Sequence, residues 1–139
     1  MQLDLFAARF FLFSLMLTLC SQVTFAQRDL DEALLLASPD MIAADSALKS
    51  HMEMLATEAV SNHCAACHGA NLAGQSGVPN LVDYDWLWGV SGFEMTQSEA
   101  VYDVIANGRT ESCPAWSQTL NAATIKALSV YIYNQFMGY

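Results

Sequence analysis

Two cysteines and a histidine fall within five consecutive residues of this chain, at Cys64, Cys67 and His68. The cysteines are three residues apart, so a helix through this segment would place both sulfur atoms on one face. Gly69 follows directly and offers a natural helix end. A group held by these three side chains has to sit against a single turn, and the rest of the chain has to fold around it.

The spacing C-x-x-C-H is the attachment sequence of haem c. The two thiols would add across the two vinyl groups of a haem, and the imidazole of the next residue would lie under the ring, directed at iron. A thioredoxin-like dithiol would need a preceding strand and a βαβ pattern, which this sequence lacks. A zinc site is the other alternative, because tetrahedral zinc takes Cys and His ligands. The chain offers these at Cys64, Cys67, Cys113, His51, His63 and His68.

The first residues differ from the rest. Arg9 precedes an apolar run over residues 10–20, and Thr24-Phe25-Ala26 resembles a small-x-small cleavage site. This predicts a signal peptide over residues 1–26 and export to the periplasm. The alternatives are a leader retained as a membrane anchor and a lipid anchor on Cys20. All three interpretations predict that the chain is exported.

Composition narrows the class further. Lys and Arg number 5 against 14 Asp and Glu, and the formal net charge is −9. A chain that binds nucleic acid needs a basic surface for the phosphates, so nucleic acid is not an expected partner. The hydrophobic content of 54% provides enough apolar surface to bury, which argues for a folded domain rather than disorder.

The periodicity predicts helices throughout. Apolar residues recur at helical spacing over 41–62, which indicates one or two helices that end near Asn62. A loop rich in Gly covers 69–80, and a short helical turn is expected over 85–88. Thr96 and Glu99 form a capping box for a helix that Gly108 stops, and Asn121 caps a final helix through Phe136. No segment alternates with period two, so we expect an all-α domain.

Three further segments make the motif specific. They are HCAACHGANLAGQSGVPNLVDYDWLWG at 63–89, VIANGR at 104–109 and CPAW at 113–116. In this order they resemble a class I cytochrome c, and they are most similar to the C-terminal haem domain of the dihaem subunit of cbb-type oxidases. The resemblance covers residues 52–137. It implies a small all-α fold wrapped around one covalent haem c, with a cytochrome c domain over 51–139. Residues 27–50 lie outside the resemblance and are expected to form an acidic N-terminal extension.

The resemblance also implies roles for single residues. Cys64 and Cys67 would form the thioethers and His68 would be the proximal iron ligand. The carbonyl of Pro79 would accept a hydrogen bond from the other His68 nitrogen, which fixes the tautomer. Trp86 and Arg109 would lie near the haem propionates, and the walls of the pocket would be Leu81, Ile105 and Trp116. For each wall residue, simple core packing is the competing interpretation.

The sequence departs from the family at the distal ligand. Where family members carry Met-Pro-Ala-Trp, this chain has Cys113-Pro114-Ala115-Trp116. Cys113 could bind iron as a thiolate, because a ferric centre lowers the pKa of a thiol. It could instead be a free or disulfide-bonded thiol beside an open site or one filled by Met95, or a tolerated substitution in a degraded haem protein. Met52 and Met54 fit helix packing.

These features predict an exported mono-haem cytochrome of a respiratory chain that carries single electrons between redox proteins, with a terminal oxidase or a dehydrogenase as partner. The expected iron ligands are His68 and Cys113, and an electron carrier is expected rather than an enzyme. Two alternatives stay open. Ligation by His and Cys also resembles that of thiosulfate-oxidising cytochromes, which suggests a role in sulfur-compound oxidation. A Cys113 bond that breaks on reduction would suit a haem-based redox or gas sensor.

Overall fold

The computed structural model describes residues 3–83, 85, 96–109 and 113–137. Its helical elements are α1 (Leu3–Leu36), α2 (Pro39–Ala44), α3 (Ser46–Ala59), η1 (Val60–Cys64), α4 (Ala65–His68), α5 (Gln97–Asn107), η3 (Trp116–Gln118) and α6 (Ala122–Met137). Within the described ranges, the extended pairings are two isolated bridges, Gln75 with Val78 and Arg109 with Cys113. The all-α prediction is confirmed. The expected turn over 85–88 lies outside the described residues except for Asp85.

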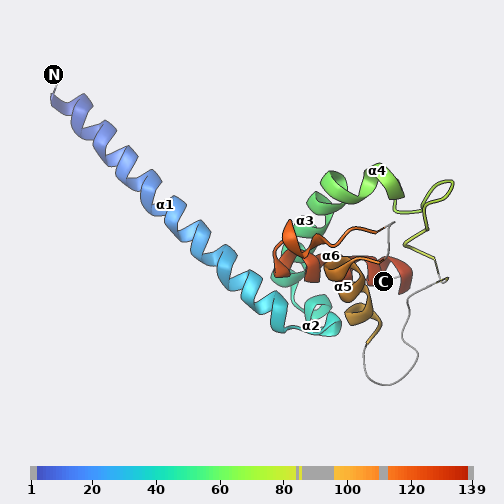
Figure 1. The fold of residues 1–139 in the computed structure, drawn as a ribbon. Coiled ribbons are helices and arrows are strands. Elements are labelled where there is room, and N and C mark those ends of the chain that lie inside the picture. Colours follow the sequence, from blue (N-terminus) through green and yellow to red (C-terminus); the bar gives the residue numbers. More distant parts are fainter. Residues whose placement is uncertain (1–2, 84, 86–95, 110–112, 138–139) are drawn as a thin grey trace.

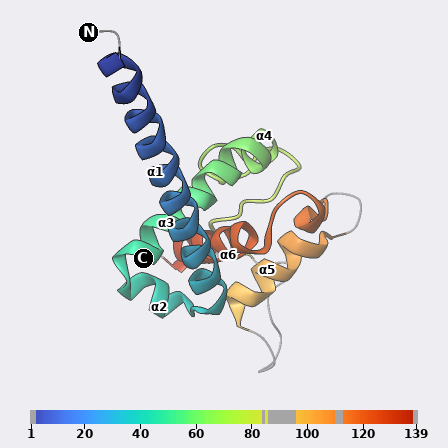
Figure 2. The same cartoon turned by 90° about the vertical axis from the view of Figure 1, so that its left-hand side faces the viewer.

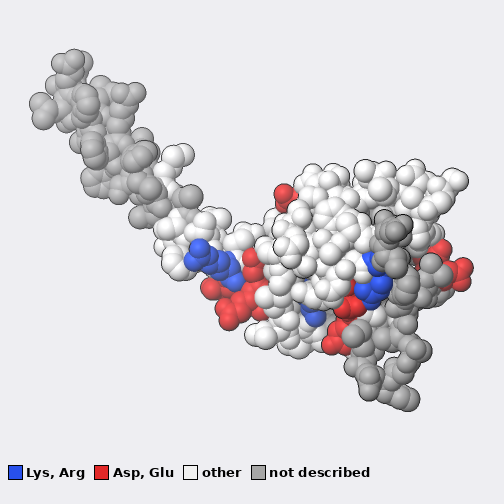
Figure 3. All heavy atoms as spheres, in the orientation of Figure 1, with Lys and Arg blue, Asp and Glu red and all other residues white. Residues whose placement is uncertain are grey.

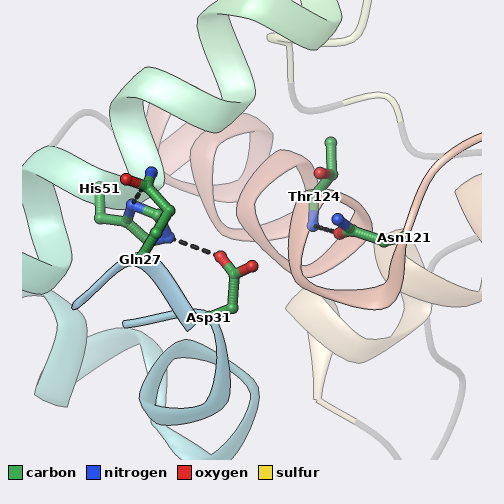
Figure 4. Close-up of polar contacts among 5 residues, drawn as sticks. All are labelled: Gln27, Asp31, His51, Asn121 and Thr124. Carbon is green, nitrogen blue, oxygen red and sulfur yellow. Dashed lines mark hydrogen bonds and ion pairs between the residues drawn. The ribbon is translucent and has the colours of Figure 1, made fainter. Parts of the chain in front are cut away.

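Helix α6 is the centre of the domain. It lies against α3 on one side and α5 on another, and it also contacts α1 (Figures 1 and 2). Its inner face carries Ile125, Leu128, Val130 and Ile132, each at most 3% exposed. Burial of four branched or long apolar side chains contributes about 1.5–3 kcal/mol each. The predicted Asn121 cap is present, because Asn121 Oδ1 accepts a hydrogen bond from the Thr124 amide at 2.8 Å (Figure 4).

The path from α3 into the C-x-x-C-H motif differs from the sequence prediction. We expected the helix to end near Asn62, but the backbone stays helical to His68. Residues Val60–Cys64 form a π-helical turn, in which the amide of Ala65 bonds to the carbonyl of Val60, five residues back. Single π turns inside α-helices are frequent at functional sites. This one inserts an extra residue and so changes which way the motif faces relative to α3.

Helix α5 begins and ends as predicted. The hydroxyl of Thr96 accepts from the Glu99 amide, and the Glu99 carboxylate accepts from the Thr96 amide at 2.7 Å. The hydrogen bonds from the Thr96 amide and hydroxyl lower the pKa of Glu99. Gly108, at φ 70°, ends the helix in the left-handed region that favours glycine.

Helix α1 continues through the predicted cleavage site and packs on the domain with its last turns only. Its first part projects away from the domain (Figure 1). Leu34 and Ile42 are fully buried in the same apolar cluster as Leu128. Part of the 27–50 extension therefore belongs to the core, and no break in packing occurs at residue 50. In the part of the chain that the structure describes, we find no helix with the length and hydropathy of a bilayer span.

A buried histidine connects α1 to α3. His51 is 4% exposed, and its Nε2 lies 2.7 Å from Oδ1 of Asp31 on α1. Its Nδ1 lies 3.5 Å from Nε2 of Gln27 (Figure 4). An imidazole withdrawn from water needs such partners, because a buried polar group without one costs about 1–3 kcal/mol. The contact holds the end of α1 on the helix that leads into the motif.

Replacing Asp31 should therefore destabilise the whole domain. We expect Asp31→Ala to lower the free energy of unfolding in urea by about 1–3 kcal/mol, because His51 loses the partner of its buried Nε2. Asp29→Ala is the matched control, since Asp29 is exposed on the same helix and should change stability by less than about 0.5 kcal/mol. Equal effects of the two substitutions would mean that the contact does not stabilise the fold.

Candidate functional site

The motif places its cysteines one helical turn apart, with Cys64 as the last residue of η1 and Cys67 within α4. Cys64 is half-buried and packs against the apolar core, whereas Cys67 is exposed one turn later. Both thiols are free in the structure. Gly69, at φ 79°, ends the turn directly after His68. The sequence thus brings two thiols and one imidazole to one edge of the domain.

His68 is oriented by a backbone carbonyl. Its Nδ1 lies 2.9 Å from the oxygen of Pro79, eleven residues further along the chain. A carbonyl only accepts hydrogen bonds, so Nδ1 must carry the proton and donate it. The lone pair of the neutral ring is then on Nε2, the atom that would bind a metal. The resemblance predicted this contact, and the structure contains it.

The loop over 69–81 is folded so that Pro79 can reach His68. The amide of Gly74 bonds to the carbonyl of His68 at 2.8 Å, and the amide of Leu81 bonds to the carbonyl of Leu72 at 2.9 Å. Gly74 has φ 75°, and a Cβ atom there would lie 2.6 Å from the Val78 oxygen. The backbone on either side of Pro79 therefore passes over Gly74 at a distance that only glycine permits.

A second glycine serves the segment that carries Cys113. A Cβ atom on Gly108 would lie 2.5 Å from the Cys113 oxygen and 2.8 Å from the Ala115 nitrogen. The backbones of Arg109 and Cys113 exchange two hydrogen bonds, of 3.0 and 3.2 Å. These hydrogen bonds join the two ends of the segment over 110–112, which lies outside the described residues. The backbone of Cys113 is thus hydrogen-bonded to the chain just beyond the C-terminal end of α5.

Two contacts bring the Cys113 segment to the motif. The ring of Trp116 lies 5.1 Å from that of His63, centroid to centroid, at a tilt of 56°. Burial raises the pKa of the Cys64 thiol, and the neighbouring thiols of Cys113 and Cys67 raise it further. The thiols of Cys67 and Cys113 are therefore near enough to Cys64 to interact with it electrostatically. Among the described residues, no three His, Cys, Asp or Glu side chains gather into the kind of group that a zinc site requires.

The other residues singled out in the sequence have different surroundings. Leu81 and Ile105 are half-buried and pack against the apolar core, as pocket walls and plain core residues both would. Arg109 donates to Asp103 and to the carbonyl of Gly108. Trp86 and Met95 lie outside the described residues. Of the two methionines expected to pack on a helix, Met52 is 2% exposed and lies in the core, whereas Met54 is 45% exposed.

Sequence reasoning missed the residues that support the ligands. Gly74 and Gly108 were interpreted only as loop and helix-end residues, although each lies under the backbone next to a predicted iron ligand or its carbonyl partner. Asp103 was not connected to Arg109, which lies six residues further on. Glycine in the sequence was the available signal for the first two. No pattern in the sequence marked the third.

These residues fit a haem c. Two thiols one turn apart match the two vinyl groups, and His68 offers an oriented nitrogen directly beside them. The described thiols are free and Cys67 is accessible, so neither is committed to another bond. Cys113 is a third free thiol among the described residues.

Comparison with known proteins identifies the family. Residues 54–132 match the family model described as cytochrome c oxidase, cbb3-type, subunit III. The cbb3-type cytochrome c oxidase subunit CcoP of Azospirillum brasilense is 42% identical over 78 residues, which cover 52% of this chain and 24% of that protein. Subunit FixP of Bradyrhizobium sp. strain ORS 278 is 38% identical over 76 residues, covering 53% and 24%. No solved structure is significantly similar.

The chain spans about a quarter of the length of these curated relatives. The family match nevertheless covers more than half of the chain, and it includes the motif, the Pro79 loop and the Cys113 segment. The chain therefore belongs to the family of cbb3-type cytochrome c oxidase subunit III, and it is an electron-transferring cytochrome c domain that binds haem c covalently.

Proposed function

We propose that this protein is an exported mono-haem cytochrome that carries single electrons to a respiratory oxidase, with His68 and Cys113 as the iron ligands. The observation that carries the proposal is the 2.9 Å hydrogen bond from His68 Nδ1 to the Pro79 carbonyl. It gives an imidazole, placed directly after two accessible thiols, the tautomer that a metal ligand needs. A packing histidine would not require that arrangement.

Haem c supplies a centre that gains and loses one electron, and the side chains determine how easily it does so. Cys64 and Cys67 would hold the group covalently against the end of α4. His68 would bind through Nε2 and would be a stronger donor because Nδ1 shares its proton with Pro79. The apolar cluster behind Cys64 excludes water from one side, and this also affects the potential.

Cys113 supports a distinct distal ligation. Two backbone hydrogen bonds to Arg109 hold its main chain, and its thiol influences that of Cys64. The resemblance implies methionine as the distal ligand at this position, so Cys113 would offer a thiolate where the family would offer a thioether. A thiolate donates more charge than a thioether and stabilises ferric iron, which lowers the potential.

The surface suits a protein partner. The relatives are named as subunits of cbb3-type oxidases, which points to an oxidase as the partner of this chain. Residues 60–82 contain no Asp, Glu, Lys or Arg, and Figure 3 shows an uncharged surface over α4, with acidic groups gathered where α1 meets the domain. Interface cores are poor in charged residues, so a partner could approach the motif without dehydrating charges there.

The proposed location is the periplasm. Residues 1–26 would act as the export signal, so that the mature chain begins at Gln27 and retains the Asp31 contact with His51. A retained segment would instead anchor the domain to the membrane through α1. Either form presents the same motif and the same Cys113 segment.

Electron carriage can be tested directly on the haem-loaded protein. We expect a redox titration followed at the haem absorption bands to fit a single one-electron transition. The reduced protein should then be reoxidised by membranes that contain a cbb3-type oxidase, at a rate that depends on oxygen. Membranes that lack the oxidase are the control. Equal reoxidation by both preparations, or a titration that needs two centres, would contradict the proposal.

Replacing Cys113 tests the distal ligation. We expect Cys113→Met to raise the midpoint potential by about 100 mV or more, within the range of about 0.8 V that axial ligands span. The ferric spectrum should gain the weak near-infrared band of His/Met ligation. Cys113→Ala should lose the spectrum of the parent without acquiring that band. An unchanged spectrum and potential in both variants would exclude Cys113 as a ligand.

Two glycine substitutions test the role of the Pro79 carbonyl. Gly74 and Gly77 both have φ near 80°, but a Cβ on Gly77 meets nothing within 4 Å. Gly77→Ala should therefore cost only the backbone strain of about 1–2 kcal/mol. Gly74→Ala should cost more and also displace Pro79, so that His68 becomes a weaker donor and the midpoint potential rises. The same potential in both variants would show that the carbonyl does not tune His68.

A further inference from the structure

The carboxylate of Asp103 accepts hydrogen bonds from two residues at the C-terminal end of α5, Asn107 and Arg109. Its Oδ1 accepts a hydrogen bond from Asn107 Nδ2 at 2.6 Å, and its Oδ2 accepts one from the Arg109 guanidinium. Asp103 and Asn107 are one turn apart on α5, whereas Arg109 lies beyond the helix end. The carboxylate therefore ties the residue after Gly108 back to the helix.

The backbone of Arg109 is in turn hydrogen-bonded to the backbone of Cys113. Its amide donates to the Cys113 carbonyl at 3.0 Å, and its carbonyl accepts from the Cys113 amide at 3.2 Å. Its guanidinium also donates to the carbonyl of Gly108 at 2.7 Å. The side chain thus ties its own backbone to Gly108 and, through Asp103, to α5. Figure 2 shows the chain from Cys113 onward running back beside α5, consistent with contacts between α5 and η3.

The charges make this arrangement stronger than neutral hydrogen bonds would. Donation by Arg109, and then by Asn107, lowers the pKa of Asp103, so the carboxylate is ionised at neutral pH. Ionic hydrogen bonds are about twice as strong as neutral ones. The pair is partly exposed, with side-chain exposures of 26% for Arg109 and 39% for Asp103. Solvent screening therefore limits its contribution to that of a surface ion pair.

From these contacts we infer that Asp103 is a positioning residue for the distal ligand: through Arg109 it holds the Cys113 segment closed over the haem site. The inference rests on the proposed ligation by Cys113. Asp103 itself would touch neither the haem nor Cys113. It would shift the equilibrium between two conformations of the Cys113 segment, one with the sulfur at the iron and one with the sulfur withdrawn.

Competition by imidazole measures that equilibrium in the ferric, haem-loaded protein. Imidazole binds iron only when Cys113 has left, so a looser segment raises its apparent affinity. We expect Asp103→Asn to raise the imidazole association constant about fivefold, the factor that corresponds to an ion pair of about 1 kcal/mol. Asp29→Asn removes the same charge from the exposed surface of α1 and should leave the association constant unchanged.

A second substitution distinguishes the proposed ligation by Cys113 from the positioning role of Asp103. Cys113→Ala should raise imidazole affinity further, and adding Asp103→Asn to it should then have no effect, because no ligand is left to position. If Cys113→Ala raises the affinity but Asp103→Asn equals Asp29→Asn, Asp103 has no positioning role although Cys113 is the ligand. If Cys113→Ala has the same affinity as the parent, the ligation fails and the inference about Asp103 fails with it.

A purely structural role for Asp103 predicts a different result. In that case Asp103→Asn would lower the melting temperature of both the parent and the Cys113→Ala protein by the same amount, with no change in imidazole affinity. This outcome would overturn the inference. Increased imidazole affinity in the parent background alone would support it.

Discussion

The hydrogen bond between His68 and Pro79 is the contact on which the site depends. It connects the end of the helical path through α3 and α4 with a loop that has no regular secondary structure. Because a carbonyl can only accept, this single contact determines both the tautomer of the imidazole and the direction of its free nitrogen. The loop geometry around Gly74 and the contact of Leu81 with Leu72 can be understood as the means of bringing one oxygen atom to one ring.

The distal side is held by a different kind of support. His68 is oriented through its own side chain, whereas Cys113 is positioned through its backbone, by Arg109 and by the close approach to Gly108. One proposed ligand therefore depends on a side-chain hydrogen bond and the other on main-chain geometry. The two supports come from separate segments, the 69–81 loop and the end of α5, and α6 packs against both α3 and α5.

Much of this arrangement could be predicted from local signals. The capping box at Thr96 and the Asn121 cap each involve residues three apart, so the sequence alone reveals them. The order of the motifs identified the cofactor and the fold. Three features were beyond local reasoning. The π turn at Val60–Cys64 has no periodic signature, the Asp31–His51 contact spans twenty residues, and the Asp103–Arg109 pair crosses a helix end. Each depends on packing that forms only in the folded chain.

Support of the distal position through the backbone has an evolutionary consequence. The Gly108 approach and the two Arg109 hydrogen bonds involve the main chain of residue 113, so they are indifferent to the side chain carried there. The residue at position 113 can therefore be exchanged by a change in one codon while the backbone that presents it stays the same. The cysteine of this chain and the methionine that the resemblance implies for the family would then occupy the same framework. Such a framework allows a lineage to adjust its position in an electron-transport chain without having to find a new fold.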